Sequence, residues 1–217
     1  MRQLTLDLLP DSPPTLDNFV PGANAEALAV FTGWLAGEPQ DTAFCLHGEA
    51  GCGKSHLLQA SGFHYVDAAA NPGLAGITAD TALAVDNVEA LDADGQIALF
   101  ALFNQLKAGG ERLLAATLQP PQHLALREDL RTRLGSGLIY RLQPLSDAEK
   151  AAALAAQAKE RALKLTPEAI DYLMRHAPRN MRTLSALIVA LDHYTLEHKR
   201  AVTLPLLREL LTLESPT

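Results

Sequence analysis

The chain has 217 residues, of which 48% are hydrophobic and 20% charged, and its formal net charge at pH 7 is −7. This length suits one substantial domain with room for a small second one, and the acidic balance excludes a general nucleic-acid coat, which needs a basic surface. No apolar stretch reaches the roughly 20 residues that span a bilayer, and the N-terminus has no signal-peptide pattern. We therefore expect a cytoplasmic protein without membrane contact.

The N-terminus is predicted to be a tail, separate from the core. The segment QLTLDLL (3–9) places a leucine at every second residue, and the proline-rich PDSPP (10–14) follows it. Such a row is either an edge strand of the protein's own sheet or a segment that binds a partner. We favour partner binding, because PDSPP is a stiff spacer and the strands that follow complete a sheet without the tail.

Strand and helix patterns alternate through the middle of the chain. A helix is predicted over 24–36, with Asn24 near its cap. Buried-strand patterns lie at 42–47, 63–68, 81–87, 112–118 and 138–142, with helix patterns between them at 55–61, 94–108 and 127–137. The core-facing residues of the helix over 94–108 are predicted to be Ile97, Phe100, Phe103 and Leu106. The alternation predicts an α/β fold with a five-stranded parallel sheet covered on both faces.

From Ser146 onward only helix patterns remain. They cover 146–163, 166–176, 180–198 and 203–213. The first begins with a capping box formed by Ser146 and Glu149. Four short helices predict a small C-terminal bundle, and the change of pattern puts the boundary near Pro144. The predicted parts are a tail at 1–14, a core at 15–144 and a helical domain at 145–217.

The segment GEAGCGKS (48–55) fits the phosphate-loop pattern GxxxxGK[ST] and lies between a predicted strand and a predicted helix. Its glycines let several backbone N–H groups point at one anion, Lys54 would reach the β- and γ-phosphates, and Ser55 would bind Mg²⁺. The nucleotide-binding residues predicted here are Gly48, Glu49, Ala50, Gly51, Cys52, Gly53, Lys54, Ser55 and His56. The expected cofactors are ADP or ATP and Mg²⁺.

A second acidic position completes the predicted site. Asp86 ends the strand over 81–87 and is expected to bind Mg²⁺ and to take part in catalysis. The next residue is Asn87, which cannot accept a proton as a carboxylate does. Glu89 either takes over that role or is a surface residue. Nucleotide binding is therefore better supported than fast hydrolysis.

With these motifs the chain resembles the AAA+ superfamily, and within it the clade of the bacterial replication initiator DnaA. The segment TLDNFVPGANAEAL (15–28) is similar to the clade's adenine-pocket segment, which implies that Phe19, Val20 and Pro21 lie near the base. The fold implied is an AAA+ phosphate-loop core followed by a helical lid domain.

Two arginines match functional positions of the clade. DLRTRL (129–134) resembles its arginine-finger segment, which implies that Arg133 acts in trans on a neighbour's nucleotide. The alternative is a solvated helix charge, which Arg127 and Arg131 nearby could also be. NMRTL (180–184) resembles the start of a lid helix, which implies a sensor role toward the bound nucleotide for Arg182, with Arg179 as a competing candidate.

The chain also departs from the clade's pattern. Leu118 stands where the clade usually has a sensor acid, and either Thr117 or Gln119 could replace it. The segment 56–80 is shorter than usual for the clade. Both departures argue against a strong intrinsic ATPase.

Short members of this clade, with a core, a lid and a leucine-rich N-terminal peptide but no basic DNA-binding domain, are regulatory inactivators of DnaA. The residues that match their peptide are Gln3, Leu4, Leu6 and Leu8, which implies binding to the sliding clamp (beta subunit) of DNA polymerase. The resemblance implies a protein beside the nucleoid that docks on the DNA-loaded clamp, meets DNA only through it, and promotes hydrolysis of DnaA-bound ATP, preventing re-initiation.

Two alternatives stay open beside this regulatory function. One is a self-cycling AAA+ loader resembling helicase or clamp loaders, and the other is a non-enzymatic adaptor that a nucleotide stabilises. AAA+ folds often self-associate, so a homodimer or a higher assembly is open as well.

Overall fold

Five parallel strands form the central sheet of the protein in the computed structural model, which describes residues 13–198 and 202–212. The strands are β1 (Ala43–His47), β2 (His64–Asp67), β3 (Leu83–Asp86), β4 (Leu113–Thr117) and β5 (Leu138–Arg141). Their order across the sheet is β2-β3-β4-β1-β5, and each neighbouring pair is parallel. The predicted α/β class and parallel sheet are therefore confirmed. All carboxyl ends lie at one edge, where open α/β sheets bind ligands.

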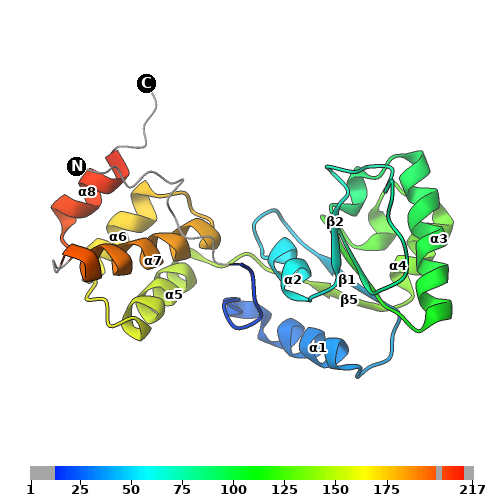
Figure 1. Ribbon diagram of the computed structural model, residues 1–217, viewed down its shortest axis with the longest axis horizontal. Coiled ribbons are helices and arrows are strands. Elements are labelled where there is room, and N and C mark those ends of the chain that lie inside the picture. The colour runs from blue at the N-terminus through cyan, green and yellow to red at the C-terminus, as the bar shows by residue number, and fades with distance from the viewer. Residues whose placement is uncertain (1–12, 199–201, 213–217) are drawn as a thin grey trace. The chain divides into compact units, whose positions relative to one another are not determined.

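Helices cover both faces of this sheet. Helices α1 (Ala25–Ala36) and α2 (Lys54–Ala60) pack on one face, and α3 (Ala93–Gly109) and α4 (Glu128–Gly135) pack on the other (Figure 1). Because successive strand residues point to opposite faces, Phe44 packs with the α1 side whereas Cys45 packs with the α3 side. The strands that are buried on both faces are continuously apolar for this reason.

Helix α3 turns a different face to the core from the predicted one. Ile97 is 49% exposed and Phe100 is only partly buried. The buried side chains are Leu99, Leu102, Phe103 and Leu106. The prediction stepped three residues at a time, and because a helix has 3.6 residues per turn, such a row drifts around the axis. The mixed three- and four-residue spacing that follows Leu99 stays on one face.

The predicted cap of α1 has another function in the structure. Asn24 ends the short 3₁₀ helix η2 (Gly22–Asn24) and makes no side-chain cap hydrogen bond to α1. Its Nδ2 instead donates to the Gln143 carbonyl oxygen at 2.9 Å, and its Oδ1 accepts from the Gln143 N–H at 2.7 Å. The buried Asn24 thus joins the segment before α1 to Gln143, which lies two residues after β5.

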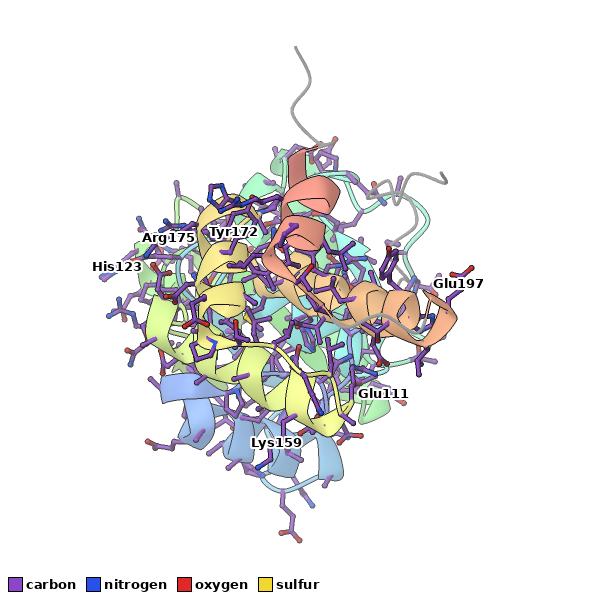
Figure 2. All side chains as sticks on the ribbon, turned by 90° about the vertical axis from the view of Figure 1, so that its left-hand side faces the viewer. Glu111, His123, Lys159, Tyr172, Arg175 and Glu197 are labelled. Carbon is purple, nitrogen blue, oxygen red and sulfur yellow. The ribbon has the colours of Figure 1, made fainter. Side chains whose placement is uncertain are left out.

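A second compact unit begins at Leu145, after the sheet-containing unit Pro14–Pro144. Its helices are α5 (Asp147–Glu160), α6 (Pro167–His176), α7 (Met181–His198) and α8 (Leu204–Thr212). The capping box is present: Ser146 Oγ accepts from the Glu149 N–H, and the Glu149 carboxylate accepts from the Ser146 N–H. Figure 2 shows Tyr172 and Arg175 along α6, where the Tyr172 ring lies 4.3 Å from that of His176.

Candidate functional site

The predicted phosphate loop connects β1 to α2, and two of its glycines are required by the space around them. A Cβ atom on Gly48 would lie 2.3 Å from the Leu142 carbonyl oxygen, and one on Gly53 would lie 2.7 Å from Cε2 of Phe19. Gly53 also has a φ of +104°, which side-chain-bearing residues rarely adopt. The loop therefore closes against Leu142, the residue after β5, on one side and against Phe19 on the other.

Lys54 occupies the hollow of this loop. Its side chain is buried, and its Nζ donates to the carbonyl oxygens of Gly48 at 2.6 Å and Glu49 at 3.0 Å. Ser55, Glu49 and Gly51 are exposed around it, and Cys52 is buried with its Sγ 3.9 Å from Nζ. A buried ammonium framed by an exposed loop is suited to binding an anion.

Three basic side chains, His47, Lys54 and Arg141, lie near the carboxyl end of β1 and this loop. Burial lowers the pKa of His47, and the charges of Arg141 and Lys54 lower it further. His47 and Arg141 are register partners on β1 and β5. Because the imidazole stays neutral at pH 7, the local positive charge comes from Lys54 and Arg141.

The predicted adenine-pocket segment lies against the same loop. The Phe19 ring is buried beside Gly53 and lies 5.4 Å from the His56 ring. The His56 Nε2 is 2.8 Å from the Thr15 carbonyl oxygen. Val20 is half-buried, as is Pro21. The structure thus brings the segment that begins at Thr15 onto the first turn of α2.

Asp86 is held rigidly at the end of β3. The residue is 1% exposed, and its Oδ1 accepts from the Asn87 N–H at 2.9 Å while its Oδ2 accepts from the Tyr65 hydroxyl at 3.0 Å. Burial is the largest of several influences that raise the pKa of Tyr65 to about 12, so the hydroxyl keeps its proton at neutral pH. Both carboxylate oxygens therefore have a fixed donor.

Asn87 is turned toward the neighbouring strand. Its backbone is left-handed, with φ of 53°, and its Nδ2 donates to Asp67 Oδ1 at 2.8 Å. Asp67 ends β2 and is the register partner of Asp86. The amide thus joins the ends of β2 and β3.

The residues after β4 include Leu118, at the position where the resemblance led us to expect a sensor acid. Leu118 is 49% exposed, and its N–H donates to Glu89 Oε2 at 3.4 Å. Thr117 is fully buried, and its hydroxyl donates to the Gln119 carbonyl oxygen at 2.7 Å. The Thr117 hydroxyl is thus engaged by the backbone, Gln119 is exposed, and half-buried Glu89 supports the backbone at Leu118.

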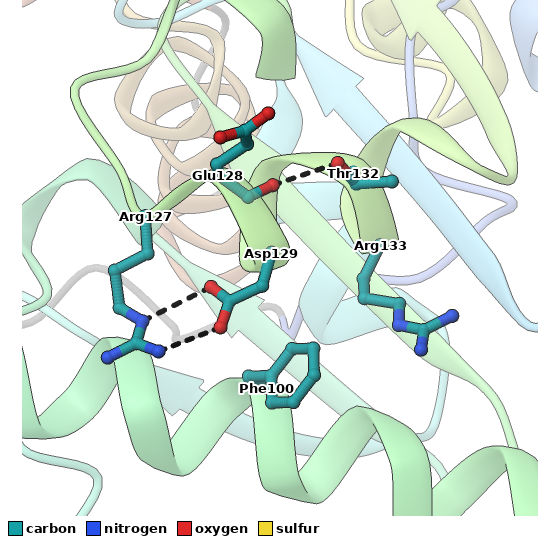
Figure 3. A pocket seen from close by; sticks show the side chains of 6 residues that line it. All are labelled: Phe100, Arg127, Glu128, Asp129, Thr132 and Arg133. Atoms are coloured by element: carbon teal, nitrogen blue, oxygen red, sulfur yellow. Dashed lines mark hydrogen bonds and ion pairs between the residues drawn. The ribbon is translucent and has the colours of Figure 1, made fainter.

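Arg133 lies on α4 beside an open cavity of about 730 Å³. Its guanidinium carbon is 5.7 Å from the centre of the Phe100 ring and 5.8 Å from that of Phe103. Figure 3 shows Arg127 paired with Asp129 at the other end of this cavity, at 2.8 Å, while Arg133 points away from that pair. This hydrogen-bonded pairing lowers the pKa of Asp129. Arg127 is thus engaged within its own helix turn.

Two family models match two separate segments of the chain. Residues 11–90 match the bacterial DnaA ATPase domain, and residues 147–211 match the lid domain of Hda. The chain is a Hda/DnaA-like AAA+ protein.

Solved structures show the same fold. DnaA domain III from Thermotoga maritima matches with a TM-score of 0.71 and 22% identity, covering 93% of this chain and 97% of that one. AMPPCP-bound DnaA from Aquifex aeolicus matches with a TM-score of 0.65 and 25% identity, covering 87% and 70%. The RuvB Holliday junction branch migration motor of T. maritima matches with a TM-score of 0.62 and 17% identity, covering 93% and 72%. These matches confirm the predicted AAA+ fold with a lid.

The lid of this AAA+ protein carries Arg182, which is exposed on the first turn of α7. Its competitor Arg179 lies 3.4 Å from Asp147 in an exposed ion pair of the same unit. Arg182 and the phosphate loop belong to different units. The predicted clamp-binding residues Gln3, Leu4, Leu6 and Leu8 lie outside the described residues.

The donor set of this AAA+ protein fits a nucleotide-bound Mg²⁺. Within 13–198 and 202–212, no cluster of three or more His, Cys, Asp or Glu residues could hold a metal by itself. Mg²⁺ in nucleotide sites needs only one or two protein oxygens beside phosphates and water, which Ser55 and Asp86 can supply. Over the same part of the chain, no helix is long and apolar enough to cross a membrane.

Sequence reasoning missed Tyr65 and Asp67, which hold Asp86 and Asn87. Neither residue belongs to a recognised motif. The available signal was their position at the end of a predicted strand, but the strand order that sets β2 beside β3 comes from the tertiary structure.

Proposed function

We propose that this AAA+ protein is a nucleotide-bound regulator that inactivates the replication initiator DnaA. It would dock on the DNA-loaded sliding clamp through Gln3, Leu4, Leu6 and Leu8 and promote hydrolysis of DnaA-bound ATP, so that initiation is not repeated. We expect it to act in the cytoplasm. The observation that carries this proposal is the match of residues 147–211 to the lid domain of Hda.

The phosphate loop would hold ADP or ATP. Lys54 faces the loop interior, where it can exchange its two backbone carbonyl partners for phosphate oxygens. Ser55 and Asp86 would hold Mg²⁺, which neutralises phosphate charge when bound. Phe19 supplies an apolar ring beside Gly53 against which a base can pack.

The geometry beside Asp86 supports a site that retains nucleotide rather than one that turns it over rapidly. A residue that activates water must reach the nucleotide with a group that accepts a proton. Asn87 has no such group, and its amide is tied to Asp67. The exposed Leu118 offers no polar group at the sensor position. These features favour a regulator or an adaptor over a self-cycling loader.

Arg133 is the residue proposed to act on DnaA-bound ATP. A guanidinium stays charged and forms paired hydrogen bonds with phosphate oxygens. Arg133 borders an open cavity, so its guanidinium can be reached by a partner. An arginine supplied in trans accelerates nucleotide hydrolysis by about 10³–10⁵.

The test is a single-turnover assay of ATP bound to DnaA, with clamp loaded on DNA and this protein added. Wild-type protein is expected to accelerate hydrolysis, and Arg133→Ala is expected to abolish that acceleration. Arg131→Ala, on the same helix, is the matched control and should behave as wild type. Fast turnover by the protein alone would favour the loader. No acceleration by wild type would overturn the regulatory function, and equal acceleration by Arg133→Ala would leave Arg133 without its role.

A further inference from the structure

The side chain of Tyr65, on β2, contacts both α2 and the end of β3. Tyr65 lies on β2 as the register partner of Ala84, so Asp86 is its diagonal neighbour on β3. The hydroxyl donates to Asp86 Oδ2 at 3.0 Å. The ring packs against the apolar cluster that contains Leu57 and Leu58 of α2, the helix that carries Lys54 and Ser55 at its start. One side chain therefore joins α2 to the acid at the end of β3.

The orientation of Asp86 depends on this hydroxyl. One carboxylate oxygen is fixed by the N–H of the adjacent Asn87, which lies on the same backbone and leaves rotation about the side-chain bonds open. Only the second oxygen is fixed from another strand, by Tyr65. Asp86 is 1% exposed, so water cannot easily replace a lost donor.

We propose that Tyr65 is a positioning residue, which aims the Asp86 carboxylate at the Mg²⁺ of the bound nucleotide and so sets the Mg²⁺-dependent part of nucleotide affinity. This inference rests on the proposed nucleotide binding. It requires no contact between Tyr65 and the nucleotide. The ring packs on the α1 and α2 side of the sheet, and removing its hydroxyl leaves this apolar packing in place.

The test compares nucleotide affinity with and without Mg²⁺. Fluorescent ADP is titrated into wild type and Tyr65→Phe, once with excess Mg²⁺ and once with EDTA. We expect Tyr65→Phe to bind about tenfold more weakly with Mg²⁺, the size of one hydrogen bond to a charged group, and to match wild type in EDTA. Tyr140→Phe is the matched control, since β4 and β1 separate its strand from β3. It should match wild type in both conditions.

A double-mutant cycle with Asp86→Asn completes the test. If Tyr65 acts through Asp86, then Tyr65→Phe has no further effect on Mg²⁺ dependence once Asp86 is Asn. The inference would be overturned if Tyr65→Phe lost the same affinity in Mg²⁺ and in EDTA, or if its Mg²⁺ dependence equalled that of wild type. It would also be overturned if Tyr65→Phe reduced the Mg²⁺ dependence as much in the Asp86→Asn background as it does in wild type. Wild type that binds no ADP in either condition would overturn both the inference and the proposed nucleotide binding. Equally tight, Mg²⁺-dependent ADP binding by wild type and Tyr65→Phe would overturn the inference and leave the proposed nucleotide binding intact.

Discussion

Asn87 shows how one residue can fit its backbone position while losing a catalytic property. Its left-handed conformation suits asparagine better than most side-chain-bearing residues. Its amide donates to Asp67, whereas a glutamate there would set two carboxylates against each other. The residue that the proposed function places beside Asp86 without a proton-accepting group therefore also joins the ends of β2 and β3.

The buried Cys45 and the half-buried Tyr65 are expected to make stability depend on pH in the alkaline range. Burial raises the pKa of Cys45 from 9.0 and that of Tyr65 from 10.0, each to about 12. The fold thus favours their neutral forms, and this stabilisation is complete below about pH 9 and is lost as the pH rises toward 12. The free energy of unfolding in urea should therefore fall as the pH rises from about 9 toward 12. Cys45→Ala should make this fall shallower, and an unchanged slope would contradict the assignment.

At the scale of elements, single side chains hold the ends of α1. At its C-terminal end, the Arg112 guanidinium lies over the Trp34 ring at 5.2 Å and the Phe63 ring at 5.9 Å. It also donates to the carbonyl oxygens of Trp34 and Leu35. A cation at a helix C-terminus is favourable, and the two rings add to it. Arg112 begins the approach to β4, so this contact ties α1 to the sheet.

At the other end of α1, Asn24→Ala removes two partly buried hydrogen bonds between the Asn24 side chain and the Gln143 backbone. We expect the free energy of unfolding of the N-terminal unit to fall by about 1–3 kcal/mol. Trp34 is the single tryptophan of the chain and is fully buried in this unit, so its fluorescence during urea denaturation reports the transition. Asn104→Ala is the control, because that amide donates within α3. Equal stabilities for the two variants would contradict the role of Asn24.

At the scale of the whole molecule, the sheet order brings distant segments to one edge. The phosphate loop follows β1, Asp86 ends β3, and Tyr65 comes from β2, although they are separated by many residues of sequence. The lid is a separate unit with its own core of apolar side chains. The phosphate loop, Asp86 and Arg133 all belong to the sheet-containing unit.

The predicted N-terminal tail (1–14) leads to a testable prediction about binding to the sliding clamp. Gln3→Ala/Leu6→Ala should weaken binding to the sliding clamp by at least about tenfold, since a peptide interface depends on a few anchor side chains. Surface plasmon resonance against immobilised clamp measures it. Thr5→Ala, between the two anchors, should bind as wild type does, and ADP affinity should be the same in all three proteins. Clamp binding by the double variant equal to that of wild type would show that the tail has another function.

The sequence by itself determined the parts of this protein that depend on neighbouring residues. The phosphate loop, the alternation of strands and helices and the capping box at Ser146 were all predictable, because backbone freedom, side-chain periodicity and capping act within a few residues. The segments that resemble DnaA also identified the family.

Only the tertiary structure decided which side chains meet. Strand order and long-range packing determine three hydrogen-bonded pairs: Tyr65 with Asp86, Asn87 with Asp67, and Asn24 with Gln143. The same is true of the buried face of α3, where Ile97 was predicted inside and lies outside. Local periodicity fixes how often an apolar face recurs, whereas its direction is set by the elements against which it packs.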